Sequence, residues 1–334
     1  MRAQCQLTHT FLERNGRHVA PSISALMKHL FVEALWRSVE RKAGNELIRE
    51  LAAGRYTSFP FISPDTFRAL ADIVIEDAEV KRREKLSERH ILYFDLAEVE
   101  GTEATYQELP ALGLLDEVLT SIAAPPVLIM SHGDFAPSAQ IMSDLESRCH
   151  RVYSINILQE TEKTKAIPLG LENLYRNRNG RLADYHHAFE HPYGGERTQM
   201  VFAAFSAENN RPIRSKVLEQ LGESRFPRPK GRLTPQEYRD QVRRTKFVLS
   251  PPGRGFDCHR TWEAIYLGAV PVVLAGSLAP GLETPLPIHS VHSYGDFLAL
   301  DDESLETIFI EFRSKNPGSA YMASWACVII ADAG

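Results

Sequence analysis

Short apolar runs alternate with helix-like patterns along most of this chain. Six runs are apolar enough and short enough to predict buried strands, over residues 90–96, 127–130, 152–157, 200–206, 246–250 and 270–274. Between most of them, apolar residues recur every three or four positions, as they do on one face of a helix. Strands that alternate with helices favour parallel sheets covered by helices, so the predicted fold class is α/β.

The alternating pattern is interrupted by a polar, aromatic and glycine-containing stretch at residues 175–198. We interpret it as an interdomain linker, which divides the chain into an N-terminal α/β domain, 1–195, and a C-terminal α/β domain, 196–334. A chain of 334 residues is long enough for two domains with separate cores. His186, His187 and His191 cluster in this stretch, and a metal site is the alternative interpretation, but we predict none.

Further helices are expected outside the strand regions. Residues 22–53 have a helical apolar stripe and predict an accessory N-terminal helical region. Ser63 and Pro64 are a strong helix start, since serine caps and proline suits the first helical position. The apolar residues after it predict one buried helix face, made of Phe67, Leu70, Ala71 and Val74. The charged run 81–85 is expected to be solvated.

The most informative stretch is Lys246 to Ser277. A strand leads into Pro-Pro-Gly-Arg-Gly, a loop that can continue neither a strand nor a helix. Asp257 is the expected N-cap of a helix that ends at Gly268, and a second strand follows at 270–274. This is a βαβ unit, and ligands of open α/β sheets bind at the carboxyl ends of the strands, where the loop must lie.

Three polar residues lie near the start of that helix. His259, Arg260 and Glu263 are three or four residues apart and therefore share one neighbourhood. Free N–H groups and the helix dipole favour phosphate at this position, and Arg260 can bind phosphate oxygens with two donors. Glu263 can hold Arg260 or accept from a sugar hydroxyl. The alternative is a solvated helix end with an ordinary Glu–Arg pair.

A second candidate for chemistry follows the strand 127–130. The sequence Ser-His-Gly-Asp at 131–134 places His132 and Asp134 at a strand end, where they can supply a general base and the group that orients it. The alternative is a polar turn that caps a helix beginning near Pro137.

Composition narrows the classes of function. The net charge of −5 gives no support for a nucleic-acid partner. No apolar run approaches the roughly 18 residues of a membrane span, and the N-terminal residues contain no apolar segment typical of a secretory signal. Four scattered cysteines predict reduced thiols rather than a disulfide framework or a zinc site.

The central stretch resembles a known signature. Arg260-x-x-Glu263-Ala264-Ile265, followed by Gly-Ala-Val-Pro-Val-Val at 268–273, is similar to the donor-binding signature of exostosin-type glycosyltransferases. Fucosyltransferases of the α1,3 type have a similar Gly-Ala-Val-Pro strand, so the Arg-x-x-Glu half carries the resemblance. The close match covers only residues 245–277. It implies the GT-B architecture, with two Rossmann-like domains facing a cleft that holds a UDP- or GDP-linked sugar.

The resemblance also implies roles for individual residues. The expected donor-binding residues come from three loop and helix starts: Ser206, Asn210, Arg211, Gly253, Arg254, Gly255, Asp257, His259, Arg260 and Glu263. Residues 167–173 resemble an Ile-Pro-x-Gly element of related proteins, which makes Glu172 and Asn173 candidate acceptor-side sugar contacts. Asp134 or His132 would act as the base in an inverting reaction. A C-terminal helix near 321–330 is expected to cross back to the first domain.

The function that follows is glycosyl transfer without a cofactor or metal, to a glycan or lipid-linked glycan, as in surface polysaccharide synthesis. The leaving diphosphate would be stabilised by arginines and helix N-termini. Without a Golgi anchor, a cytoplasmic enzyme with at most peripheral membrane contact is expected, at or near the inner membrane face. Two alternatives remain open: a GT-B nucleotide-sugar epimerase or phosphorylase, and a non-catalytic protein that binds sugar nucleotides or glycans. The stereochemical outcome also remains open.

Overall fold

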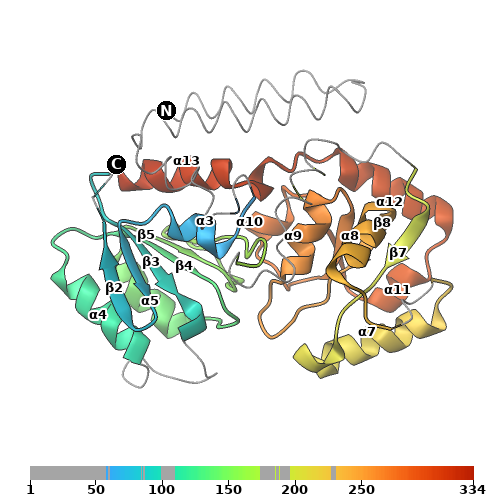
Figure 1. Cartoon of the computed structure of the whole chain (residues 1–334), viewed down its shortest axis with the longest axis horizontal. Helices are drawn as coiled ribbons and strands as arrows, with labels where there is room; N and C mark the ends of the chain where they lie inside the picture. Colours follow the sequence, from blue (N-terminus) through green and yellow to red (C-terminus); the bar gives the residue numbers. More distant parts are fainter. Residues whose placement is uncertain are drawn as a thin grey trace.

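The computed structural model describes residues 58, 61–83, 85, 87–98, 110–173, 185, 188, 196–226 and 231–334. The predicted helix at 22–53 lies outside these residues, as do most of the predicted linker and its three histidines. In the described part, the strands form two separate sheets, which lie side by side and are covered by helices (Figure 1). The α/β fold class is therefore confirmed.

The first sheet has six strands in the order β2-β1-β3-β4-β5-β6, and all its neighbours are parallel except the hairpin β1–β2. Its strands are β1 (Ile73–Glu76), β2 (Glu79–Arg82), β3 (Ile91–Asp95), β4 (Val127–Ser131), β5 (Arg151–Ser154) and β6 (Thr164–Ala166). Every residue of β4 is buried, as expected for a central parallel strand that is covered on both faces.

Helices cover the first sheet on both sides. α4 (Pro110–Ser121) and α5 (Ala139–Arg148) lie on one face, and α3 (Pro64–Arg68) and α13 (Met322–Ala333) lie on the other (Figure 1). The C-terminal helix thus returns to the first sheet, as the sequence predicted. Asp332 of α13 accepts hydrogen bonds from Tyr153 Oη at 2.6 Å and from Arg151 Nε at 2.9 Å, which fixes the helix to β5.

The second sheet has four parallel strands in the order β10-β9-β8-β7. They are β7 (Gln199–Phe202), β8 (Thr245–Leu249), β9 (Val270–Leu274) and β10 (His289–Val291). One face packs on α7 (Arg211–Glu223), α11 (Tyr294–Leu298) and α12 (Asp302–Ser314), and the other on α8 (Pro235–Arg243) and α9 (His259–Tyr266). The short helix α10 (Pro280–Glu283) and three 3₁₀ turns, η1 (Leu96–Glu98), η3 (Ala207–Asn209) and η4 (Gly318–Ala320), complete the described elements.

Strand order differs from the Rossmann-like expectation. Apart from the edge hairpin, the described strands of each sheet follow one another in chain order, without the reversal that defines a Rossmann switch point. Among these strands, there is therefore no point of reversed strand order at which a ligand could bind. A ligand site can instead form where the loops at the carboxyl ends of the two sheets meet.

The predicted long helix after Ser63 is wrong in its extent. Ser63 caps α3 through a reciprocal pair of bonds with Thr66, as expected, but the helix ends at Arg68. The β-branched sequence Ile73-Val74-Ile75 forms β1 instead, because such side chains fit a pleated sheet better than a helix. Asp77 and Ala78 turn the chain with φ values of 54° and 55°, so part of the charged run joins β2.

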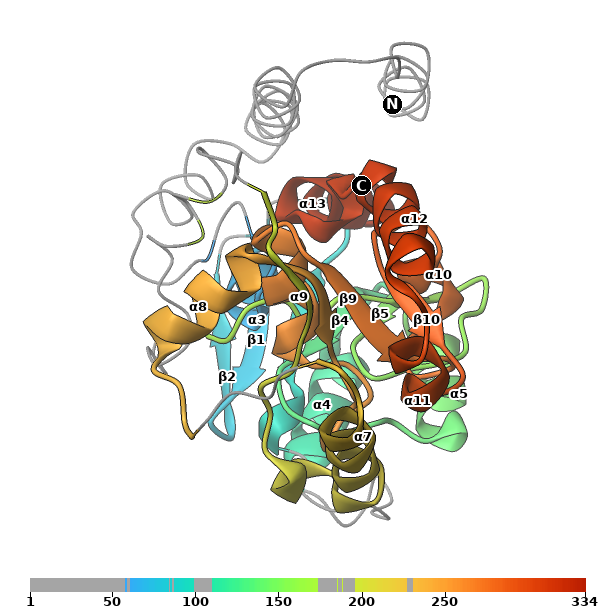
Figure 2. The ribbon, with the colours of Figure 1, turned by 90° about the vertical axis from the view of Figure 1, so that its right-hand side faces the viewer.

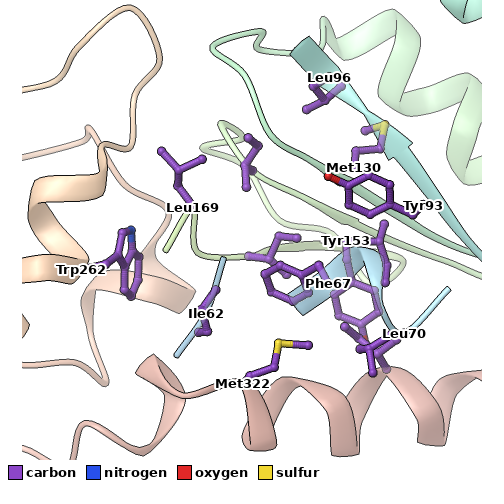
Figure 3. Packing of buried hydrophobic residues seen from close by; sticks show 14 of the residues in the cluster. Ile62, Phe67, Leu70, Tyr93, Leu96, Met130, Tyr153, Leu169, Trp262 and Met322 are labelled. Atoms are coloured by element: carbon purple, nitrogen blue, oxygen red, sulfur yellow. The ribbon is translucent and has the colours of Figure 1, made fainter. Parts of the chain in front are cut away.

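Helix α9 connects the two sheets through one continuous apolar core. Its residues Trp262 and Tyr266 belong to the same buried cluster as the strands of the first sheet, and Figure 3 shows Trp262 beside Ile62 and Leu169. The Tyr266 hydroxyl accepts from Ile62 N at 3.1 Å and donates to Ala320 O at 2.6 Å. The apolar stripe predicted for this helix is thus confirmed. It packs on its own sheet and also on segments of the first one.

The two long C-terminal helices, α12 and α13, lie along one edge of the described part of the molecule (Figure 2). None of the helices in the described ranges combines the length and the apolar character required to cross a bilayer.

Gly170 provides a test of how the segment after β6 is held. Its φ is +73°, and a Cβ atom would lie 2.1 Å from Ile62 O, so alanine would meet both strain and a backbone clash. We expect Gly170→Ala to lower the free energy of unfolding by roughly 2–5 kcal/mol. The matched control is Gly276→Ala, where φ is +77° but no atom lies within 4 Å. Urea unfolding that gave both variants the same loss would contradict the close packing at Gly170.

Candidate functional site

The loops that follow β4, β5 and β8 meet between the sheets, and Asn156 holds them together. Asn156 Oδ1 accepts from Asp257 N at 3.2 Å, while Nδ2 donates to Gly133 O at 3.4 Å and Phe135 O at 3.3 Å. A Cβ on Gly255 would lie 2.8 Å from Asn156 Oδ1, which explains the glycine at that position. Asn156 therefore links the Ser-His-Gly-Asp turn to the Pro-Pro-Gly-Arg-Gly loop.

Asp257 is not the N-cap of α9, contrary to the prediction. Cys258 occupies that position and makes no side-chain cap. The Asp257 carboxylate instead accepts from Leu169 N at 2.9 Å, Trp262 Nε1 at 2.7 Å and Cys258 N at 2.7 Å. These bonds place Asp257 between the segment after β6 and α9, where it positions the start of the helix. Burial raises its pKa to about 6, although the three hydrogen bonds oppose the shift.

Two guanidinium groups lie against one aromatic ring at the carboxyl ends of β7 and β8. The Arg260 and Arg214 Cζ atoms are 5.4 Å and 5.6 Å from the centre of the Phe205 ring. Arg260 Nε donates to Ala204 O at 3.2 Å, but its Nη1 is buried and has no hydrogen-bond partner. We call Arg214, Arg260 and Phe205 the arginine pair site.

The two guanidinium groups of the arginine pair site are balanced only at longer range, Arg214 by Asp134 and Arg260 by Glu263. Among the described ion pairs, neither guanidinium meets a carboxylate. Burial lowers the pKa of Arg214, and the neighbouring charge of Arg260 lowers it further. Like charges are normally kept apart in proteins unless an anion between them repays the repulsion. The arrangement therefore has the chemistry of a site for a phosphate or another compact anion.

The cation that α7 contributes to the site is Arg214, whereas the sequence predicted Arg211 as the donor-binding arginine. Arg211 points into solvent and pairs with Glu208 at 2.7 Å. Arg214 is buried, with 3% of its surface exposed, and donates to Pro252 O at 2.9 Å and Ser206 O at 3.1 Å. The signal was its spacing, because Arg214 lies on the same face of α7 as the buried Val217 and Leu221.

Of the remaining predicted donor-binding residues, some contact the arginine pair site and others are exposed to solvent. Asn210 caps α7, and its Nδ2 donates to Gly253 O at 3.0 Å. Gly253 lies against Arg214, since a Cβ there would be 3.1 Å from Nη2. Ser206 and Arg254 are exposed. The structure thus brings Asn210 and Gly253 to the arginine pair site, and it leaves the Arg254 side chain in solvent.

Behind Arg260, acidic residues from both halves of the chain come together. Glu263 is only 7% exposed, and burial raises its pKa, opposed by the charges of His259 and Arg260. The charge of Glu172 raises that pKa further, so Glu172 lies close to α9. His259 Nδ1 is 2.8 Å from Gly170 O, which ties the helix start to the same segment. The predicted donor-side and acceptor-side residues therefore form one neighbourhood.

Two polar atoms in this neighbourhood are buried without a hydrogen-bond partner. They are Glu172 Oε2 and Asn173 Oδ1. Tyr238 lies beside Glu263, whose charge helps to raise the pKa of the phenol. Unpaired buried polar groups are costly, and they accumulate where a ligand completes their hydrogen bonds. Glu172 and Asn173 thus keep their place as candidate sugar contacts, beside Glu263.

On the other side of Asn156, His132 pairs with an aspartate that sequence reasoning did not select. Its Nδ1 is 2.9 Å from both Asp95 Oδ1 and Asp95 Oδ2. Asp95 ends β3 directly beside Ser131 of β4, so two strand ends bring the pair together. Asp134 is exposed and is not the group that orients His132, which corrects the prediction. The negative charge of Asp134 acts on Arg214 and partly opposes the lowering of the Arg214 pKa by burial and by Arg260.

In the described ranges, no group of three or more His, Cys, Asp and Glu side chains is placed to hold a metal ion. No model of a known protein family matches the sequence, and no curated protein matches it either. The chemistry of the site is therefore the basis for a functional inference.

Titration of Asp257 should make the unfolding free energy of the protein depend on pH. Its pKa of about 6 in the folded protein exceeds that of an unfolded aspartate, about 3.9, so folding takes up a proton between these values. The ionised carboxylate disfavours the folded state above pH 6, and this penalty fades as the pH falls towards 4. From pH 7 to pH 5, the wild type should gain about 1.3 kcal/mol of unfolding free energy relative to Asp257→Asn.

The measurement is urea unfolding of both proteins across this range. Asparagine has no proton to gain, so it serves as the reference for all other titrating groups. Parallel stability curves for the two proteins would show that Asp257 is ionised in both states and would contradict the assignment.

Proposed function

We propose that this protein is a glycosyltransferase that moves a sugar from a UDP- or GDP-linked donor to a hydroxyl of a glycan or lipid-linked glycan. The arginine pair site binds the diphosphate, and the turn at 131–134 approaches from the opposite sheet, on the acceptor side. The proposal includes the GT-B arrangement of two domains, 1–195 and 196–334, and action in the cytoplasm at or near the inner membrane face.

The observation that carries the proposal is the pair of guanidinium groups, neither of which forms an ion pair with a described carboxylate. In glycosyl transfer, negative charge grows on the departing diphosphate as the bond to the sugar breaks. Fixed cations and helix N-terminal N–H groups that already point at this charge stabilise the transition state. Arg260 lies in the first turn of α9, which has no side-chain cap, and Arg214 contacts the same Phe205 ring. This arrangement provides the stabilisation without requiring a metal ion.

The polar neighbourhood behind Arg260 supports a donor that carries hydroxyl groups. Glu263 and Glu172 offer carboxylate oxygens, and Asn173 offers an amide oxygen, so the group that completes them must donate hydrogen bonds. Ribose and hexose rings present several such hydroxyls. A nucleotide sugar therefore matches both halves of the site, the cationic half through its diphosphate and the acidic half through its hydroxyls.

The first test is the affinity for nucleoside diphosphates. Arg260→Ala should weaken the binding of UDP or GDP by roughly 1.5–3 kcal/mol, the usual range for a charged hydrogen bond, or about 10- to 150-fold in Kd. Arg260→Lys should restore only part of the affinity, because an ammonium cannot reproduce the two parallel donors of a guanidinium. Calorimetric titration with UDP, GDP and pyrophosphate measures all three proteins.

The matched control is Arg211→Ala, which removes an exposed arginine from the same loop region and should leave Kd unchanged within about twofold. Glu263→Ala should weaken the intact nucleotide more than pyrophosphate, since only the nucleotide carries hydroxyls. Wild-type affinity in Arg260→Ala, or an equal loss in Arg211→Ala, would mean that α9 is only a scaffold.

A further inference from the structure

The Pro-Pro-Gly-Arg-Gly loop is anchored at its two glycines. Asn210 Nδ2 donates to Gly253 O at 3.0 Å, and a Cβ on Gly253 would lie 3.1 Å from Arg214 Nη2. Gly255 lies against Asn156, whose Oδ1 would be 2.8 Å from a Cβ at that position. Asn210 and Arg214 belong to the start of α7, whereas Asn156 follows β5 of the first sheet. Side chains from both halves of the chain therefore fix the course of the loop.

Two side chains of this anchored loop are exposed, those of Arg254 and Phe256. Phe256 is 40% exposed and is one of three exposed large apolar side chains in the described part of the chain, with Ile310 of α12 and Val328 of α13. Within the ranges that the structure describes, Arg254 makes no hydrogen bond, ion pair or ring contact. A loop of fixed shape thus presents a free cation and an open aromatic ring.

The position of the loop relates both side chains to the proposed reaction. Arg254 and Phe256 flank Gly255, which touches Asn156. Asn156 Nδ2 also donates to Gly133 O of the Ser-His-Gly-Asp turn, on the acceptor side. At its other end, the loop touches the arginine pair site through the contact of its first glycine. The two exposed side chains therefore belong to the segment that joins the diphosphate side of the site to the acceptor side.

We propose that Arg254 and Phe256 bind the acceptor, and that this acceptor is a sugar that carries a negative charge. This inference rests on the proposed glycosyltransferase function and assigns the class of its acceptor. The C–H face of a sugar ring stacks on Phe256, because these C–H groups are slightly positive and the face of an aromatic ring is slightly negative. The Arg254 guanidinium donates two parallel hydrogen bonds to the anionic group, a geometry that suits both carboxylate and phosphate.

The free cation favours an anionic acceptor over a neutral one. In the proposed function, the diphosphate binds guanidinium groups that the fold itself holds in place, through contacts such as the bond from Arg214 to Pro252 O. Arg254 is fixed only through the backbone of its loop, so its side chain is available for a second anion. The chain has a net charge of −5, which disfavours acidic ligands in general. A local cation is therefore what would admit one.

The inference is tested by the binding of three methyl glycosides, measured by saturation-transfer NMR titration in the presence and absence of UDP. They are the neutral methyl glucoside, the carboxylate methyl glucuronoside and the phosphate ester methyl glucoside 6-phosphate. The wild type should bind at least one charged glycoside about fivefold more tightly than the neutral one. A preference for the carboxylate identifies an acidic glycan as the source of the charge, and a preference for the phosphate identifies a phosphorylated carrier.

Two variants separate the contributions of the cation and the ring. Arg254→Gln should abolish the preference for the charged glycosides and leave the neutral one unchanged. Phe256→Ser should weaken all three by about fivefold, whereas Phe256→Tyr should retain wild-type binding because it keeps the ring. Both positions are exposed, so we expect these variants to fold. The matched controls are Arg211→Gln and Ile310→Ser, which remove an exposed arginine and an exposed apolar side chain elsewhere and should bind as the wild type does.

Three results would overturn the inference. The first is a wild type that binds neither charged glycoside more tightly than the neutral one. The second is an equal loss of affinity in the control variants. The third is weaker binding of Phe256→Ser to phosphatidylglycerol vesicles with unchanged glycoside affinities, which would make the loop a membrane contact instead.

UDP affinity separates this inference from the proposed function. Arg254→Gln and Phe256→Ser should bind UDP within about twofold of the wild type, because neither side chain belongs to the arginine pair site. A tenfold loss of UDP affinity in Arg254→Gln, about 1.4 kcal/mol, would place the diphosphate on this loop and reject the acceptor assignment. Unchanged UDP and GDP affinity in Arg260→Ala would reject the proposed function, while a preference for charged glycosides that depends on Arg254 would still stand as glycan binding.

Discussion

The structure depends on one buried carboxylate. Asp257 joins the segment after β6 to the start of α9 through three N–H donors, and Asn156 and His259 add further polar contacts where the carboxyl ends of the two sheets meet. Burying a charge among apolar residues is unfavourable, and the raised pKa of about 6 measures that cost. These hydrogen bonds engage the Asp257 carboxylate, and the N-terminus of α9 has no side-chain cap.

The loop and the Phe205 ring hold both arginines in this region. Arg214 donates to Pro252 O and Ser206 O. The guanidinium groups of Arg214 and Arg260 both lie over the Phe205 ring. Without a ligand, their charges repel and one guanidinium nitrogen is unpaired. The scaffold supplies the free energy that keeps them together, and an anion would recover it. Such local conflict within a well-packed fold is typical of a binding site.

The sequence predicted local features well and long-range pairs poorly. The strand-loop-helix-strand unit around α9 was correct because glycine, proline and helical periodicity act over a few residues. The helix start at Ser63 followed from capping chemistry. The contacts of Asp257 with Leu169 and of His132 with Asp95, in contrast, join residues 88 and 37 positions apart, and no local pattern encodes them. The hairpin after α3 was missed because its apolar residues also fit a helical stripe.

The central claim is that the arginine pair site binds a diphosphate. A crystal structure of the protein grown with UDP or GDP tests it most directly. We expect the phosphate oxygens within hydrogen-bond distance of Arg260 Nη1, which now has no partner, with Arg214 as the second nearest cation. A nucleotide bound elsewhere, with the Arg260 and Arg214 guanidinium groups still in contact with Phe205 and free of phosphate, would contradict the account.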